Sequence, residues 1–158
     1  MMIVVMSDTH LTKLTASFQE LCEQYCTEAD LVIHLGDSMA GPVLDYLEQY
    51  PLEAVAGNMD DASIQRRLPD KKIIQVESYR IGLTHGWGNP FGLRGRLLND
   101  FKGVDAILFG HTHEALQLHQ DGIFWFNPGS VTLGRGSSRE SLGILHINDT
   151  IRSEIIPL

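Results

Sequence analysis

Seven side chains that could bind a metal follow the apolar runs of this sequence. They are Asp8, His10, Asp37, Asn58, His85, His111 and His113. Carboxylate, amide and imidazole groups are ligands for divalent ions such as Mn, Fe, Ni or Zn. The set contains no cysteine, which argues against a structural zinc site. Seven ligands are too many for one tetrahedral ion, but they suit two ions that share a carboxylate and lie about 3.5–4 Å apart.

Three apolar runs in the first part of the chain predict buried strands, at Met2–Met6, Leu31–Leu35 and Leu52–Ala56. Two segments between them predict helices: Leu14–Tyr25 has apolar residues three and four apart, and Pro42–Gln49 starts with a proline suited to a first helical turn. This alternation predicts a parallel sheet with right-handed crossovers. Because ligands bind beyond the carboxyl ends of such strands, the polar residues that follow each run should meet at one edge.

The second half of the chain has a different pattern, in which strands are joined by short turns. We expect strand pairs at Lys72–Val76 with Arg80–Thr84, Ala115–His119 with Ile123–Phe126 and Leu142–Ile147 with Ile151–Ile156, a buried strand at Ala106–Phe109, and a helix at Phe91–Phe101. His85 and His111 stand just beyond the ends of two of these strands. We therefore expect the histidines of the second half to lie at the same edge of the fold as the ligands of the first half.

Taken together, these motifs resemble those of the calcineurin-like metallophosphoesterases. The motifs are Asp8-Thr9-His10, Gly36-Asp37, Gly57-Asn58-Met59-Asp60, His85-Gly86, Gly110-His111-Thr112-His113 and Asn127-Pro128-Gly129-Ser130. The size of the chain and its hairpin-rich second half look most like the small bacterial and archaeal phosphodiesterase branch, which includes a retromer subunit of the same fold. The resemblance implies an α/β fold: a four-layer α-β-β-α sandwich of two facing mixed sheets flanked by helices.

The resemblance also divides the ligands between two ions, which the residues alone could not do. It implies that Asp8, His10 and His113 bind the first ion, that Asn58, His85 and His111 bind the second, and that Asp37 bridges both. A water that bridges two such ions loses a proton near neutral pH and becomes a hydroxide nucleophile. We therefore expect a phosphodiesterase that acts on small phosphodiesters and uses two divalent ions, with Mn favoured over Ni, Fe or Zn.

The sequence departs from the superfamily pattern at Met59. Many members carry a histidine there, thought to protonate the leaving group, and methionine cannot donate a proton. We therefore expect slow turnover or a preference for acidic leaving groups such as phenols. Asn58, Asp60 and His111 form the expected catalytic set, in which Asp60 either orients a ligand histidine, the favoured role, or acts on the leaving group.

Several other residues have both a structural and a functional interpretation. His34 is expected to be a core histidine, His119 and His146 surface histidines, and the Asn127–Ser130 segment a turn or a support for the metal histidines. Trp87 fits a wall of the substrate pocket or the core equally well. Arg94, Arg96 and Arg135 are expected to be solvated rather than to hold a phosphate, and Cys22 and Cys26 to be reduced thiols on one helix face.

The 158 residues carry a formal net charge of −8, with 12 basic and 20 acidic side chains. Length and hydrophobic content predict one domain over residues 1–158. The acidic balance argues against a long nucleic acid as partner, and the sequence shows neither a membrane span nor a signal peptide. We expect a cytoplasmic enzyme; the sequence leaves its oligomeric state open, and a homo-oligomer is one option because dimers and tetramers are common among resembling proteins. The alternatives are a protein-binding scaffold of the same fold and a phosphomonoesterase or nuclease.

Overall fold

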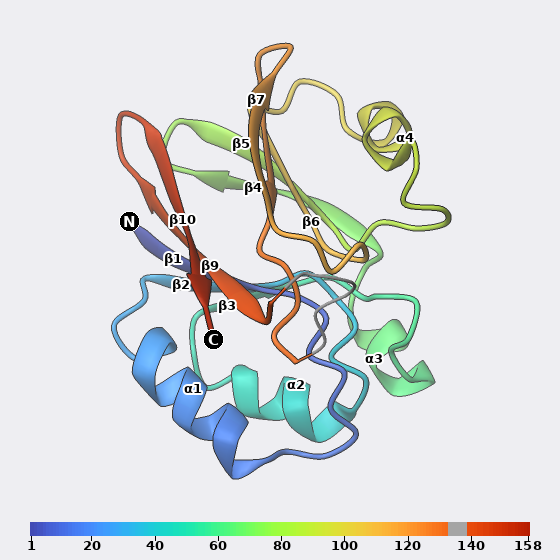
Figure 1. The fold of residues 1–158 in the computed structure, drawn as a ribbon, viewed down its shortest axis with the longest axis vertical. Coiled ribbons are helices and arrows are strands. Elements are labelled where there is room, and N and C mark those ends of the chain that lie inside the picture. The colour runs from blue at the N-terminus through green and yellow to red at the C-terminus, as the bar shows by residue number, and fades with distance from the viewer. Residues whose placement is uncertain (133–138) are drawn as a thin grey trace.

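The computed structural model describes residues 1–132 and 139–158. The elements follow one another as β1 (Met2–Met6), α1 (Ala16–Cys26), β2 (Leu31–His34), α2 (Gly41–Leu47), β3 (Leu52–Ala54), α3 (Ala62–Arg67), β4 (Lys71–Val76), β5 (Tyr79–Thr84), α4 (Leu93–Asp100), β6 (Ala106–Phe109), β7 (Leu116–Gln120), β8 (Ile123–Asn127), β9 (Ser141–Ile147) and β10 (Ile151–Pro157). The strands form two sheets that face each other (Figure 1).

Both sheets are mixed. The first has the order β10-β9-β1-β2-β3, in which β1, β2 and β3 are parallel and β9 and β10 form an antiparallel hairpin beside β1. The second has the order β4-β5-β6-β8-β7, in which β5, β6 and β8 are parallel and the two outer strands are antiparallel to their neighbours. The parallel strands of each sheet end at the edge where the ligand motifs lie.

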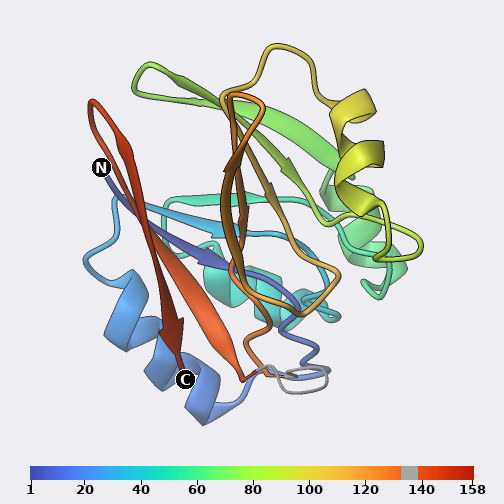
Figure 2. The same ribbon diagram turned by 45° about the horizontal axis from the view of Figure 1, so that its top comes forward.

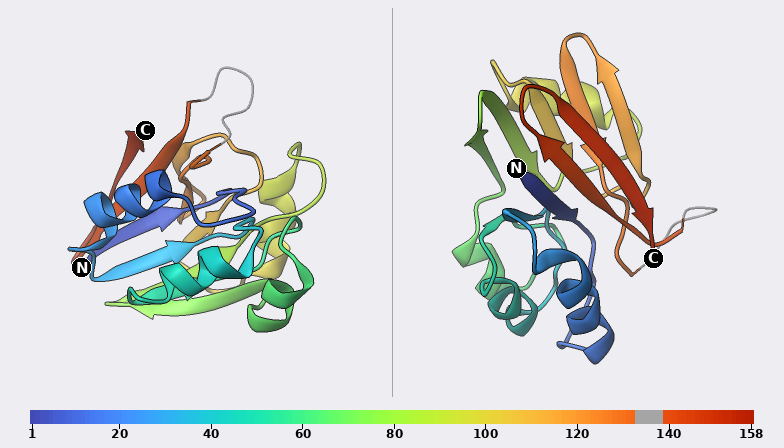
Figure 3. Two further views of the ribbon diagram at one scale, coloured as in Figure 1. Left: turned by 90° about the horizontal axis from the view of Figure 1, so that it is seen from below. Right: turned by 90° about the vertical axis from the view of Figure 1, so that its left-hand side faces the viewer.

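Alternate side chains of the strands pack into different layers, which is the period expected of a strand. In β1, Ile3 and Val5 enter the core between the sheets, whereas Val4 and Met6 pack against α1 and α2. In β6, Leu108 lies between the sheets and Ile107 packs under α4. Figure 3 shows α1 and α2 along the outer face of the first sheet, and Figure 2 shows α4 outside the second. The four-layer sandwich is therefore confirmed.

The predicted elements are all found, with bounds shifted by one or two residues. The helix expected at Phe91–Phe101 begins only at Leu93, because Gly92 before it adopts a left-handed φ of 74°. The six-residue helix α3 was not predicted, since Ile64 is its only buried side chain and no apolar period marks it. It is capped by Asp61, whose carboxylate accepts hydrogen bonds from the backbone amides of Ser63 and Ile64. No helix of the described residues is long and apolar enough to cross a membrane.

Candidate metal centre

Most of the expected ligands have a backbone conformation that residues other than glycine rarely adopt. Five of the seven have a left-handed φ: Asp8 (55°), His10 (49°), Asp37 (57°), His111 (68°) and His113 (59°). Each such residue costs about 1–3 kcal/mol and persists only where its surroundings fix it, often at functional sites. The sharp turns at the strand ends therefore hold the ligands in place at a cost in stability.

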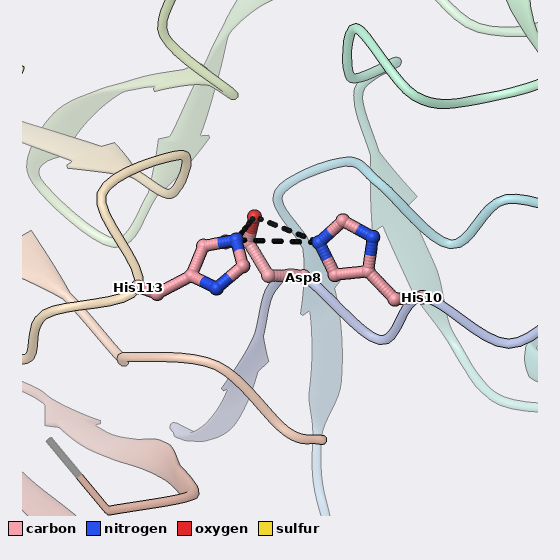
Figure 4. Close-up of side chains that lie close together, drawn as sticks. All are labelled: Asp8, His10 and His113. Carbon is pink, nitrogen blue, oxygen red and sulfur yellow. Dashed lines mark hydrogen bonds and ion pairs between the residues drawn. The ribbon is translucent and has the colours of Figure 1, made fainter. Parts of the chain in front are cut away.

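Three ligands from distant parts of the chain form the first cluster (Figure 4). Asp8 follows β1, His10 lies two residues further on, and His113 follows β6. Asp8 Oδ1 lies 3.0 Å from His113 Nε2 and 3.6 Å from His10 Nε2, and the two ring nitrogens are 3.2 Å apart. One oxygen and two imidazole nitrogens thus point at one another, a donor set that suits a divalent cation.

A second cluster lies beside the first and shares Asp8 with it. Asp37 Oδ2 lies 3.2 Å from His85 Nε2 and 3.7 Å from His10 Nε2. His85 Nε2 is also 3.9 Å from Asp8 Oδ1. Because Asp37 faces a histidine of each cluster, its carboxylate stands where a bridging ligand would.

Asn58 and His111 meet at the exposed rim of the site. Asn58 Oδ1 lies 3.1 Å from His111 Nδ1. His111 Nε2 is 2.7 Å from the carbonyl oxygen of Gly88, which can only accept, so this nitrogen carries the proton. His85 is held in the same way, because its Nδ1 lies 2.7 Å from the carbonyl oxygen of Leu35. In both rings this contact leaves the other nitrogen, which faces the site, available to a metal once it is deprotonated, the arrangement of metal-binding histidines.

The two aspartates are anchored by one oxygen each. Asp8 Oδ2 accepts hydrogen bonds from the Ser7 hydroxyl (2.6 Å) and the His111 amide (3.1 Å). Asp37 Oδ1 accepts one from the Met59 amide (2.7 Å). The other oxygen of each carboxylate points at the imidazoles. These anchoring contacts were not predicted: Ser7 stands beside a motif in the sequence, but a backbone amide or carbonyl leaves no sequence signal.

Two atoms at the centre of the site, Asp8 Oδ1 and His85 Nε2, form no hydrogen bond of favourable geometry among the described residues, and each lies within ion-pair distance of another proposed ligand. Asp8 is fully buried and His85 is 2% exposed. A buried polar atom without a partner costs about 1–3 kcal/mol, and more when it is charged. A cation between the clusters would be coordinated by both atoms and remove this penalty. The residues therefore fit a divalent metal.

The carboxylates and the imidazoles shift one another's pKa. Burial alone would raise the pKa of Asp8, but the imidazoles of His10 and His113 beside it hold that pKa well below its usual range. Burial alone would also raise the pKa of Asp37, and the neighbouring His85 lowers it. Conversely, burial alone would lower the pKa of His85, but Asp37 and Asp8 raise it. In the metal-free site the surroundings thus favour the charged forms of both carboxylates and of the His85 imidazole.

Metal affinity should therefore fall in acid. Since His85 has a raised pKa, a cation must displace its proton, and affinity should drop about tenfold per pH unit as the pH falls through that pKa. Calorimetric titration with Mn²⁺ from about pH 8 to about pH 6 measures this. The exposed His146 provides the control, because His146→Gln should leave the slope unchanged. Equal affinity at both pH values would contradict ligation by imidazole.

The Asn127–Ser130 segment supports both metal loops, which confirms the supporting interpretation. The Asn127 amide nitrogen donates to the carbonyl oxygen of Gly110 and to the Thr112 hydroxyl, both at 3.0 Å. The Ser130 hydroxyl donates to the carbonyl oxygen of Asp8 at 2.9 Å. A Cβ added to Gly110 would lie 1.9 Å from Ser7 Oγ, so only glycine permits this approach of the two loops.

Asp60 has a different role from the favoured one. Its carboxylate accepts hydrogen bonds from the backbone amides of Asp37, Met39 and Gly57 and from the Ser38 hydroxyl, two on each oxygen. It is 5% exposed. Asp60 therefore orients the turn that carries Asp37, and its hydrogen bonds among the described residues do not include a ligand histidine. Action on a leaving group stays a prediction, which this burial disfavours.

The remaining histidines agree with their interpretations. His34 is buried, and its ring nitrogens contact the Thr9 hydroxyl and the amide of Gly36. Burial lowers the pKa of His34 to about 4, so it is a neutral core residue. His119 and His146 are exposed.

Among the described residues, Arg94, Arg96 and the two cysteines form no hydrogen bond or ion pair with the ligands of the two clusters. Arg94 donates to Gln120, and Arg96 donates to backbone carbonyls near Trp87. Arg135 lies outside the described residues. Cys22 and Cys26 are buried free thiols on one face of α1, as predicted.

Comparison with known proteins gives the family. A model of the calcineurin-like phosphoesterase superfamily domain matches residues 1–150, so the chain belongs to that superfamily. A probable metallophosphoesterase of Methanocaldococcus jannaschii is 33% identical to it over 162 residues, covering 100% of this chain and 82% of that protein. The crystal structure of a predicted phosphoesterase from Streptococcus pneumoniae superposes with a TM-score of 0.79 at 26% identity, covering 99% of this chain and 88% of that one.

Two more distant structures share the fold. An archaeal phosphodiesterase has a TM-score of 0.73 at 22% identity, covering 99% of this chain and 100% of that one. Vps29 of Entamoeba histolytica, solved in complex with zinc, has a TM-score of 0.74 at 23% identity, covering 99% of each chain. The expected resemblance is therefore confirmed in family and fold.

Proposed function

We propose that this protein is a phosphodiesterase that hydrolyses small phosphodiesters with two divalent ions. Asp8, His10 and His113 would hold the first ion, Asn58, His85 and His111 the second, and Asp37 both. The observation that carries the proposal is the pair of buried atoms without hydrogen-bond partners, Asp8 Oδ1 and His85 Nε2, at the meeting point of the two clusters. When bound, the ions supply an activated water and positive charge for the phosphoryl oxygens.

Other residues of the protein would hold the proposed ligands in position. Ser7 and the His111 amide fix the Asp8 carboxylate, and the Met59 amide fixes Asp37. The carbonyl oxygens of Leu35 and Gly88 fix the proton positions of His85 and His111. A site held this rigidly is preorganised for the charge that develops during hydrolysis.

A diester suits the site better than a monoester. Arg94 and Arg96, the two described arginines considered as phosphate contacts, are engaged with Gln120 and with backbone carbonyls. A phosphodiester carries one negative charge fewer than a fully ionised monoester and needs less neutralisation. The archaeal phosphodiesterase of the same fold agrees with this choice. Mn²⁺ is the proposed metal, because oxygen and imidazole ligands suit it.

The test is turnover of bis-p-nitrophenyl phosphate with added Mn²⁺. The wild type should hydrolyse it, and His111→Ala should reduce kcat/KM by about a hundredfold or more, because the second ion would lose one of its proposed ligands. His119→Ala is the matched control, since His119 is exposed on β7, and should keep full activity. Hydrolysis that persists without any metal, or in His111→Ala, would refute the proposal.

A protein-binding scaffold is the competing function, and the fold shared with Vps29 is its support. The convergence of Asp8, His10, His85 and His113 favours the enzyme. Failure to hydrolyse any phosphoester in a panel, together with a stable complex with another protein, would favour the scaffold.

A further inference from the structure

A cavity of about 370 Å³ adjoins the metal centre, a volume within the range of small-molecule sites. Asn58 and His85, both proposed ligands, form part of its wall. Trp87 forms another part, and Lys71 and Asp100 line it as well. A phosphodiester held at the metals would therefore direct one of its ester groups into this cavity.

Trp87 is exposed, yet it is held in place. Its side chain is 55% exposed. The Arg96 guanidinium lies over its ring, with Cζ 5.0 Å from the centroid, and donates to the carbonyl oxygens of Trp87 (3.0 Å), Asn89 and Phe91 (3.1 Å). Trp87 lines the cavity, and Arg96 is not among its lining residues.

The segment that carries Trp87 is also tied to the metal centre. Gly86 and Gly88 on either side have φ values of 95° and 74°, a backbone that favours glycine. The carbonyl oxygen of Gly88 accepts the hydrogen bond of His111 Nε2. The indole therefore has a fixed position relative to a proposed metal ligand.

The rest of the cavity is polar. Lys71 Nζ and Asp100 Oδ1 form an ion pair at 2.5 Å, and Gln65 and Asp70 line the same wall. A cavity lined by polar side chains and by an aromatic residue suits a flat heterocycle better than an alkyl chain, because a ring can stack while its heteroatoms form hydrogen bonds.

We propose that Trp87 is a specificity-determining residue that stacks on a planar heterocycle of one ester group, so that the substrate is a phosphodiester of nucleotide size. Arg96 would act through Trp87, as a positioning residue. This inference rests on the proposed function, because the phosphate must sit at the metal centre for its substituent to reach the cavity.

Binding of two phosphate ligands to the Mn²⁺-loaded protein tests the inference. Adenosine monophosphate carries the heterocycle and ribose 5-phosphate lacks it. We expect the wild type to bind the first more tightly and Trp87→Leu to bind it about tenfold more weakly, the factor of about 1.4 kcal/mol expected of one stacked base. Affinity for ribose 5-phosphate should not change. Trp87→Phe should keep most of the preference, and Arg96→Lys should lose part of it.

Fluorescence locates the contact independently of activity. The chain has two tryptophans, and Trp125 is buried in the core beneath α4. Adenosine monophosphate should therefore quench emission in the wild type but not in Trp87→Phe. Phe91→Ala is the matched control: Phe91 is 91% exposed in the same segment but does not line the cavity, and its loss should change nothing.

The outcomes separate this inference from the proposed function. A wild type without preference for the heterocycle, or a Trp87→Leu variant that keeps it, overturns the role of Trp87 even if bis-p-nitrophenyl phosphate is still hydrolysed. Loss of that hydrolysis in the wild type is a failure of the proposed function, whatever the fluorescence shows.

Discussion

Asp37→Asn should lower kcat/KM for bis-p-nitrophenyl phosphate by about a thousandfold or more. The substitution keeps the size of the side chain and the acceptor for the Met59 amide, but it removes the negative charge that faces His85 at 3.2 Å and His10 at 3.7 Å. Because Asp37 is the proposed bridge, the variant should also bind fewer than two Mn²⁺ ions. Steady-state kinetics and elemental analysis of the purified variant measure both effects.

Asp45→Asn is the matched control for this substitution. Asp45 lies on α2, pairs with Arg67 and is exposed, so removal of its charge should leave kinetics and metal content unchanged. The melting temperature of Asp37→Asn should be compared with that of the wild type to show that the variant is folded. A folded Asp37→Asn protein with two ions and near wild-type turnover would contradict the bridging role.

Met59→His should raise the rate on substrates with a poor leaving group by about a hundredfold. Met59 follows the proposed ligand Asn58 and is 52% exposed, so a histidine can be accommodated beside the bound substrate. An imidazolium there could protonate a departing alkoxide, which is the gain expected of a general acid. A diester with an alkyl leaving group should respond strongly, whereas p-nitrophenolate, which leaves unprotonated, should respond little.

The pH profile distinguishes this effect from better binding. Only the protonated histidine donates, so the gain of Met59→His should decline as the pH rises above the pKa of the new residue. Met59→Gln, polar but unable to act as an acid, should show no gain. An equal gain on both leaving groups, or a gain independent of pH, would mean that Met59 does not mark the site of leaving-group protonation.

The sequence pattern was sufficient to predict most strands and helices, and the family resemblance supplied the layers in which they pack. Apolar runs mark the strands regardless of tertiary context, and the period of α1 marks its buried face. The short helix α3 escaped prediction because its position is set by the Asp61 cap and by a single buried residue, Ile64. Elements that depend on one capping side chain and one buried residue carry too little pattern to be found from the sequence alone.

The candidate site was predicted in its residues but not in its supports. Metal-binding side chains at strand ends are visible as residue types, and the structure brings Asp8, His10, Asp37, His85 and His113 together. The carbonyl oxygens of Leu35 and Gly88 leave no trace in the residue types. Asp60 illustrates the same limit: its type suggested a partner for histidine, but burial and four donors direct it to the Asp37 turn.

Crystals grown with Mn²⁺ would test the central claim most directly, through anomalous scattering from the bound ions. The account predicts two peaks per chain about 3.5–4 Å apart, one beside Asp8, His10 and His113, the other beside Asn58, His85 and His111, with Asp37 between them. A single peak, or none within reach of Asp8 Oδ1 and His85 Nε2, would contradict it.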